Sequence, residues 1–267
     1  MPRRFRPTLL AALALAAPPA FGQSNEELAK QLANPVASLI SVPFQFNYND
    51  GFGPQDGHQS YVNIQPVVPL SLSENWNLIV RTIVPVIDQD DVVPGTGSQF
   101  GLGDTTQEIF FSPKQPTRGG VIWGVGPALL WPTATQDELG QGKWGVGPTG
   151  VVLRQQGPWT YGMLANHIWS YADAGDEDRP EVNNTFLQPF LNYTTKKATS
   201  FFLNTESNYN WEAEEWSVPI NAGVNQLFTV GKQRMQLGGG VRYWVDTPES
   251  GPDGWGARLI LTFLFPR

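Results

Sequence analysis

Residues 234–265 read RMQLGGGVRYWVDTPESGPDGWGARLILTFLF, and apolar and polar side chains alternate through both halves of this stretch. Met235, Leu237 and Val241 fall on one face, with Arg234 and Arg242 on the other. Because successive side chains of a β-strand point to opposite faces, each half is expected to separate an apolar medium from a polar one. Two structures fit this pattern, a half-buried soluble sheet and a membrane-spanning β-barrel.

The N-terminus predicts export. Residues 1–22 carry Arg3, Arg4 and Arg6, then an apolar run from residue 9 to 17, and they end in Ala20-Phe21-Gly22. This is the pattern of a secretory signal peptide cut before Gln23. The apolar run is too short for a membrane-spanning helix, which needs roughly 20 residues.

The remaining 245 residues fit one large domain. Removing the three arginines changes the formal charge from -7 to -10, which disfavours nucleic-acid binding. The chain has no cysteine, which argues against a small disulfide-stapled module. No long apolar run follows the signal, so a helical membrane protein is excluded, whereas a barrel is not, because its lipid-facing residues alternate with polar ones.

Alternation and turn residues predict twelve strands of about the 9 to 11 residues that cross a bilayer at a tilt. An even number is typical of single-chain bacterial barrels. The expected ranges are 39–48, 59–70, 76–87, 100–112, 121–133, 144–155, 159–171, 183–194, 199–210, 216–229, 233–246 and 255–265.

The connections between these strands alternate in length. The odd connections, including 49–58, 88–99 and 172–182, are mostly long, and the even ones, such as 71–75 and 156–158, are mostly short. Eighteen of the 24 acidic residues lie in or beside the odd connections. Long outer loops and short periplasmic turns are typical of outer-membrane barrels.

Tryptophan gives a third indication. All ten lie near a predicted strand end, where aromatic rings form the two girdles of a membrane barrel. Trp76, Trp123 and Trp159 are expected at the inner rim. Seven are expected at the outer rim: Trp131, Trp144, Trp169, Trp211, Trp216, Trp244 and Trp255.

Motifs for other functions are weak. The GVGPTG run at residues 145–150 matches a dinucleotide pattern, but no helix is expected after it. His167 and Ser170 lie three apart in a predicted strand and therefore on opposite faces, so they cannot act together without a bulge. The acidic segment 173–181 lacks EF-hand spacing, so carboxylates that are solvated or bridge lipopolysaccharide are the default there, with a metal site as the lesser alternative.

Residues 23–41 differ from the rest of the chain. Ser24 followed by Glu27 forms a capping-box pattern, and Leu28 and Leu32 share one helical face before Pro35. A short periplasmic helix is expected here, and both a plug in the barrel mouth and a free segment remain open.

The chain also resembles a known family through several motifs: NPVASLISVP at 34–43, FGLGD at 100–104, PTAT at 132–135, ANHIW at 165–169 and LFPR at 264–267. They are similar to bacterial outer-membrane barrels named as transporters and associated with phenol meta-cleavage pathways, some of which carry the hormone name neuromedin U. The resemblance implies an outer-membrane barrel and uptake of small or hydrophobic compounds. The closing Pro266-Arg267 departs from the terminal aromatic residue common in barrels.

We therefore predict an all-β, antiparallel transmembrane barrel of about twelve strands at residues 42–267, preceded by a signal peptide at 1–22 and a periplasmic helical segment at 23–41. A narrow or gated path is expected, since this size lies between packed eight-stranded barrels and open porins. Strand parity places these residues in the lumen: Asn63, Gln65, Arg81, Arg154, Asn204, Glu206, Asn208, Arg234, Gln236, Arg242 and Arg258.

The function expected is passive transport of small or hydrophobic, including aromatic, compounds across the bacterial outer membrane, without enzymatic activity, cofactor or metal. The expected partners are outer-membrane lipid and lipopolysaccharide, the cargo, and the barrel-assembly machinery during biogenesis. A lipid-modifying enzyme using His167 and a structural or surface-binding barrel remain as alternatives.

Overall fold

A computed structural model describes residues 23–175 and 179–265. The predicted signal peptide and the closing Pro266-Arg267 lie outside the described residues. The elements, in chain order, are α1 (Asn25–Leu32), β1 (Ile40–Phe52), η1 (Gly53–Gln55), β2 (Gly57–Ile64), β3 (Val67–Ser71), β4 (Trp76–Asp90), β5 (Ser98–Leu102), β6 (Thr105–Pro113), β7 (Val121–Trp131), η2 (Asp137–Leu139), β8 (Lys143–Gln156), β9 (Trp159–Asp173), β10 (Asn183–Thr194), β11 (Thr199–Thr205), β12 (Ser207–Asn210), β13 (Glu215–Val230), β14 (Gln233–Asp246) and β15 (Trp255–Phe265).

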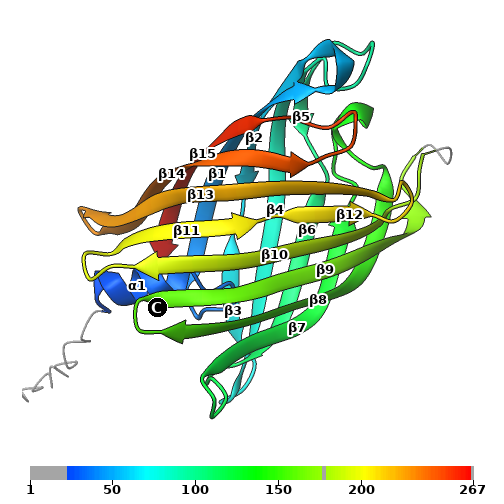
Figure 1. The fold of residues 1–267 in the computed structure, drawn as a ribbon. Helices are drawn as coiled ribbons and strands as arrows, with labels where there is room; N and C mark the ends of the chain where they lie inside the picture. The colour runs from blue at the N-terminus through cyan, green and yellow to red at the C-terminus, as the bar shows by residue number, and fades with distance from the viewer. Residues whose placement is uncertain (1–22, 176–178, 266–267) are drawn as a thin grey trace, which may run out of the picture.

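These strands form one closed antiparallel barrel (Figure 1). Three pairs of short strands, β2 with β3, β5 with β6 and β11 with β12, each continue one path across the wall, so that the wall has twelve strands. The first and last strands close it, with Ile40 opposite Phe265 and Tyr48 opposite Ala257. The predicted twelve-stranded fold is confirmed. Several strands run further toward the long loops than predicted, β1 to Phe52 and β4 to Asp90.

Prolines explain the interruption between β11 and β12. Pairing of this path with β10 stops at Leu187 and resumes at Phe190, leaving Pro189 between them. On the other side, the register of β13 places Pro219 opposite Glu206. Since proline has no N–H, it cannot donate a ladder hydrogen bond at either position. Glu206 therefore sits at a local break in the ladder.

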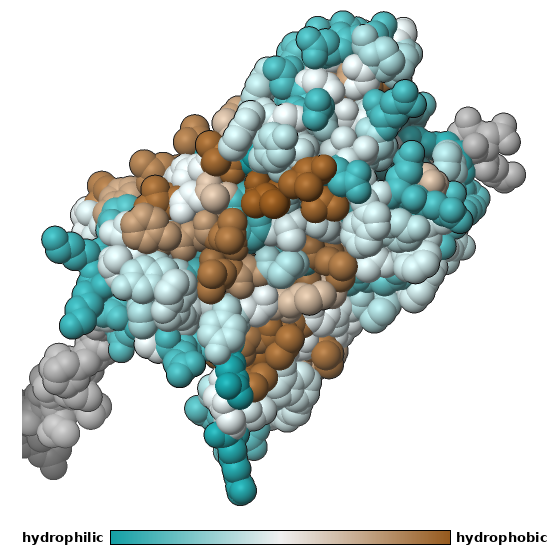
Figure 2. All heavy atoms as spheres, in the orientation of Figure 1, coloured by the Kyte–Doolittle hydropathy of each residue, from teal (hydrophilic) through white to brown (hydrophobic). Residues whose placement is uncertain are grey.

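The outer wall carries an apolar belt. Leu203, Val224, Leu237 and Leu259 are about half exposed because they point away from the barrel. Figure 2 shows apolar residues gathered over the middle of the visible wall, with hydrophilic residues at both ends. No helix in the described part of the chain is long and apolar enough to cross a membrane.

Tryptophans meet in pairs at the two edges of this belt. At the short-turn end the rings of Trp76 and Trp123 lie 5.8 Å apart, and at the long-loop end those of Trp131 and Trp144 lie 5.5 Å apart. The prediction was wrong for Trp244, whose indole N–H donates to Asn49 inside the barrel at 3.3 Å. Its even position on β14 puts it on the same face as Arg242, so its nearness to a strand end was misleading.

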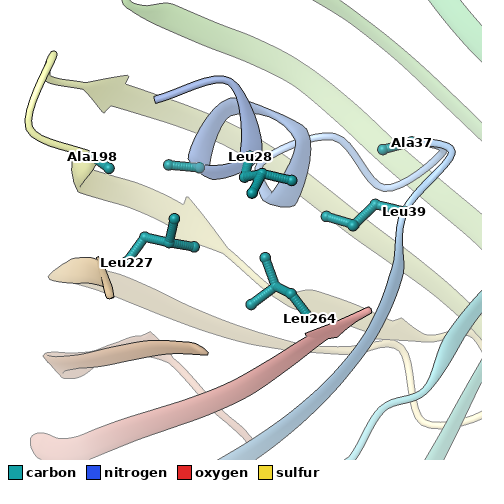
Figure 3. Packing of buried hydrophobic residues seen from close by; sticks show 7 residues of the cluster. Leu28, Ala37, Leu39, Ala198, Leu227 and Leu264 are labelled. Atoms are coloured by element: carbon teal, nitrogen blue, oxygen red, sulfur yellow. The ribbon is translucent and has the colours of Figure 1, made fainter. Parts of the chain in front are cut away.

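The helix α1 has the predicted capping box. The Ser24 hydroxyl accepts from the Glu27 backbone N–H at 3.2 Å, and the Glu27 carboxylate accepts from the Ser24 backbone N–H at 2.9 Å. The helix lies at the short-turn end of the barrel (Figure 1), and its Leu28 and Ala29 are buried. There Leu28 packs with side chains from the inner wall and from the chain after the helix, namely Ala37, Leu39, Ala198, Leu227 and Leu264 (Figure 3).

Close strand packing gives a test of the wall. A Cβ on Gly126 of β7 would lie 1.9 Å from the backbone oxygen of Ile109, whereas a Cβ on Gly150 of β8 would have its nearest neighbour at 3.7 Å. We expect Gly126→Ala to lower the yield of folded barrel strongly, because the backbone itself must shift, and Gly150→Ala to leave it unchanged. Heat-modifiable migration on a gel measures the folded fraction, and equal fractions for the two variants would contradict this packing.

Candidate functional site: the barrel lumen

Most of the residues predicted to line the lumen lie on the inner face. Cavities in the interior are lined by Asn63, Gln65, Arg81, Asn204, Glu206, Asn208, Gln236 and Arg258. Arg242 is buried and bonded to Glu206. Arg234 shares the face of Gln236 at the short-turn end, where its guanidinium donates to the backbone oxygen of Gln23 at 3.2 Å.

Arg154 is an exception, and its predicted position was wrong. Its neighbour Leu153 is buried inside the barrel, while Arg154 is exposed on the outer face. The inward-facing residues of each strand were predicted on the assumption that the interior is polar throughout. At this height the interior is apolar, since Val151 and Leu153 pack in a cluster with Val36 from the segment after α1.

Glu206 holds the central charge network. Arg258 donates to both of its carboxylate oxygens, from Nη1 at 2.9 Å and from Nη2 at 2.6 Å. Arg242 donates to the same carboxylate at 2.7 Å. The two arginines also donate to Asn47, Asn221 and Tyr61, so that every nitrogen of both guanidiniums is bonded. This network, which we call the Glu206 clamp, joins residues from β1, β2, β13, β14 and β15 around one carboxylate.

A second network lies on β4, β6, β8 and β9. Arg81 donates to the Glu108 carboxylate at 2.9 Å and to the Gln65 side-chain oxygen at 3.1 Å. The other oxygen of Glu108 accepts from Thr149 at 3.1 Å and from Asn166 at 2.9 Å. Glu108 was not predicted as a lumen residue, because the consecutive Ile109, Phe110 and Phe111 break the alternation of its strand.

Two cavities meet at Arg81. The first, of about 230 Å³, extends toward the short-turn end, and its lining combines apolar side chains with amides that include Gln45, Gln188 and Asn192. The second, of about 260 Å³, combines apolar side chains with Asn166, Asn184 and Asn208. Arg81 contributes to the lining of both. The interior is therefore partly filled, as expected for this barrel size.

The segment that follows α1 closes the first cavity on one side. Residues 31–35, with Ala37 and Leu39, form part of its lining. Two side-chain bonds tie this region to the wall: Asn77 donates to the Ser38 hydroxyl at 2.6 Å, and Gln155 donates to the backbone oxygen of Lys30 at 2.8 Å. Of the two arrangements left open by the sequence, the structure has the plug. We call residues 25–39 the plug segment.

A third cavity, of about 260 Å³, opens toward the long loops. Its lining includes Trp244, Phe52 and Tyr61, with Asn49 and Asn63 among the polar groups. The guanidinium of Arg242 lies 5.3 Å from the Trp244 ring centroid, within cation–π distance. Sequence reasoning missed this aromatic lining because Trp244 was assigned to the lipid interface.

The weaker motifs have structural positions. The GVGPTG run lies within β8, where a Cβ on Gly147 would lie 1.7 Å from the backbone oxygen of His167, so this glycine permits close strand approach. His167 faces outward, bonded to Thr185 at 2.7 Å, while Ser170 donates to Glu181. These two residues are not brought together. Among the described residues, no cluster of three metal-ligating side chains is present.

The ends of β8 and β9 carry an ion-pair cluster. The buried ammonium of Lys143 donates to Asp173 and, at 3.2 Å, to Glu181. The hydrogen bond from Ser170, followed by that from Lys143, holds the pKa of Glu181 below its ordinary value. Glu181 thus remains charged at lower pH than a free carboxylate and ties the loop before β10 to the barrel rim.

One comparison with solved structures supports the architecture. No family model matches the sequence, and no curated protein matches it. Among solved structures, the COG4313 outer membrane channel from Pseudomonas putida F1 superposes with a TM-score of 0.66 at 14% identity, covering 85% of this chain and 96% of that chain. This chain has the fold of an outer-membrane β-barrel. The outer membrane phospholipase A from Escherichia coli gives a TM-score of 0.49 at 9% identity, covering 84% and 90% of the two chains.

Replacing Glu206 tests the clamp. Glu206→Gln leaves two guanidiniums, each 2% exposed, without their shared counter-charge. We expect a loss of about 3 kcal/mol in the free energy of unfolding, since removing one partner of a buried ion pair leaves an uncompensated charge. Guanidinium unfolding in detergent, followed by tryptophan fluorescence, measures it. Glu249→Gln in an exposed loop is the control, and equal stability of the two variants would refute the clamp.

The Glu181 contacts give a pH dependence. Because its pKa is lowered in the folded state, Glu181 stabilises the fold above the ordinary carboxylate pKa of about 4.3, and this contribution is lost as the pH falls below that value through the folded pKa. We expect the difference in melting temperature between the wild type and Glu181→Gln to stay constant as the pH falls from neutral toward that value, and to shrink below it. A difference that grows on acidification would show the opposite sign.

Proposed function

We propose that the protein is a passive channel of the bacterial outer membrane for small compounds with an apolar, including aromatic, body. The observation that carries this proposal is the set of three interior cavities: one opens toward the long loops, and the other two share Arg81 in their lining, one of them reaching the plug segment. A barrel that served only as a scaffold would have no need for such spaces beside paired charges. Apolar side chains in the second cavity and aromatic ones in the third suit an apolar solute.

The arrangement of the barrel suggests its orientation. Long acidic loops face the cell exterior, where lipopolysaccharide is the expected partner, and the short turns face the periplasm. In this orientation the plug segment lies at the periplasmic mouth, so a solute enters through the cavity beside Trp244 and passes the layer of Arg81 and the Glu206 clamp. The outer belt contacts membrane lipid.

The plug segment is the gate in this proposal. Its contact with the wall combines two apolar clusters, one around Leu28 and one around Val36, with few hydrogen bonds, and it is not part of the β-ladder. Displacing it therefore breaks no strand pairing. Opening requires movement of the plug segment alone, whereas opening at the Glu206 clamp would separate buried ion pairs.

Liposome swelling with a graded set of solutes tests transport. We expect slow, size-limited swelling for the wild type. Leu28→Asp is expected to speed it several-fold, because a carboxylate cannot remain in the apolar cluster and the plug segment is released. Asn25→Asp adds the same charge at the exposed start of α1 and should leave the rate unchanged. No swelling by either the wild type or Leu28→Asp, in barrels shown to be folded, would refute the channel function.

A further inference from the structure

We propose that the solutes accepted by this lumen are small organic carboxylates, whose anionic group is bound at Arg81 and whose apolar body occupies the second cavity. This inference rests on the proposed channel function and adds the charge of its cargo and the residue that recognises it. Arg81, Glu108, Glu206, Arg242 and Arg258 form the layer of buried ion pairs that we call the middle layer. The inference follows from the charge balance of this layer, the position of Arg81 and the lining of the second cavity.

The charge balance of the middle layer is positive. In the part of the chain that the structure describes, its ion pairs join three guanidiniums, those of Arg81, Arg242 and Arg258, to two carboxylates, those of Glu108 and Glu206. One positive charge is left in surplus. Charged side chains that line a narrow pore set the sign of the ions admitted, so this layer favours anions.

Arg81 is the arginine best placed to bind a ligand. Its side chain is 15% exposed, compared with 2% for both Arg242 and Arg258. Its guanidinium has five N–H groups, of which two donate to Glu108 and Gln65, so further donors remain for a ligand. Since Arg81 lines both inner cavities, its remaining donors lie where a passing solute can meet them. Guanidinium groups bind carboxylates strongly because the hydrogen bonds are charge-assisted.

Glu108 lies in the same lining, yet it does not cancel this site. Its side chain is only 1% exposed, and its two oxygens are already bonded by Arg81, Thr149 and Asn166. The Glu108 carboxylate is therefore occupied by hydrogen bonds to side chains of the barrel wall. A ligand beside Glu108 can contact only the guanidinium of Arg81 and neighbouring amide groups.

The second cavity also has room for an apolar body and a polar substituent. Ile83, Leu130, Ile168, Val182 and Phe186 supply the apolar lining. The side-chain oxygen of Asn184, which lines the same cavity, is buried and has no hydrogen-bond partner in the described structure. A hydroxyl group both donates and accepts, so it can pair with this amide in either orientation. A hydroxylated aromatic carboxylate, such as 4-hydroxybenzoate, is thus a suitable probe.

The test uses the full-length protein in planar bilayers under a KCl gradient. For the wild type we expect a reversal potential whose sign shows that chloride passes more readily than potassium. We also expect 4-hydroxybenzoate to reduce the current at a concentration about tenfold lower than its neutral isostere 4-hydroxybenzamide, since a hydrogen bond to a charged group is worth about one order of magnitude in affinity. The cation 4-hydroxybenzylammonium should be the weakest of the three.

Variants separate the charge balance from the binding residue. Arg81→Gln leaves two guanidiniums and two carboxylates in the middle layer. Both the preference for anions and the selective block, meaning the stronger block by 4-hydroxybenzoate than by 4-hydroxybenzamide, should therefore be lost. The double variant Arg81→Gln with Glu108→Gln restores the surplus charge without Arg81, so anion preference should remain while selective block is lost. It also avoids leaving Glu108 unpaired. Arg154→Gln on the outer face is the matched control and should behave as the wild type.

Two results would overturn the inference: a wild-type reversal potential of zero or of cation sign, or equal block by the three probes. If the barrel carries no current, the channel proposal fails, and calorimetric titration of the detergent-solubilised protein with the same probes still decides the binding site. Tighter binding of 4-hydroxybenzoate than of the benzamide, abolished by Arg81→Gln, would support it. Equal or undetectable binding of the two would refute it.

Discussion

Closure of the sheet is the constraint on which this structure depends. Strands surrounded by lipid cannot leave backbone N–H and C=O groups unpaired. The first strand, β1, therefore pairs with the last, β15, whose residues are more than 200 positions away in the sequence. Once the ring is closed, alternation assigns one face of every strand to lipid and the other to the interior. The polar groups of the interior must then satisfy each other or water, which explains why arginines, carboxylates and amides meet there in networks.

The Glu206 clamp and the Arg81 network brace the interior at one level. Glu206 lies where Pro189 and Pro219 interrupt the backbone ladder, so side-chain bonds replace backbone bonds as the links between strands at this point. Such a brace keeps the wall together but narrows the lumen. It leaves cavities beside it, and it brings a surplus of positive charge to this level of the lumen.

The plug segment makes the interior chemically uneven. Near Val36 and Leu28 the inner wall is apolar, with Val151, Leu153 and Leu227 pointing inward. The prediction of inward-facing residues from strand alternation assumed a polar interior throughout. This assumption placed Arg154 on the wrong face. It succeeded for Arg81, Glu206, Arg242 and Arg258, which form the buried ion pairs of the interior. Trp244 was misplaced for a related reason, because proximity to a strand end does not say which face a ring occupies.

The sequence by itself determined the strands, their number, the long and short connections and the capped helix, because each depends on periodicity or turn chemistry within about fifteen residues. Only the tertiary structure decided which side chains meet in the lumen. Arg258 reaches Asn47 across 211 positions and Glu206 across 52, and the plug segment enters the mouth instead of remaining free. These contacts depend on ring closure and on the volume inside the ring, neither of which leaves a local pattern in the chain.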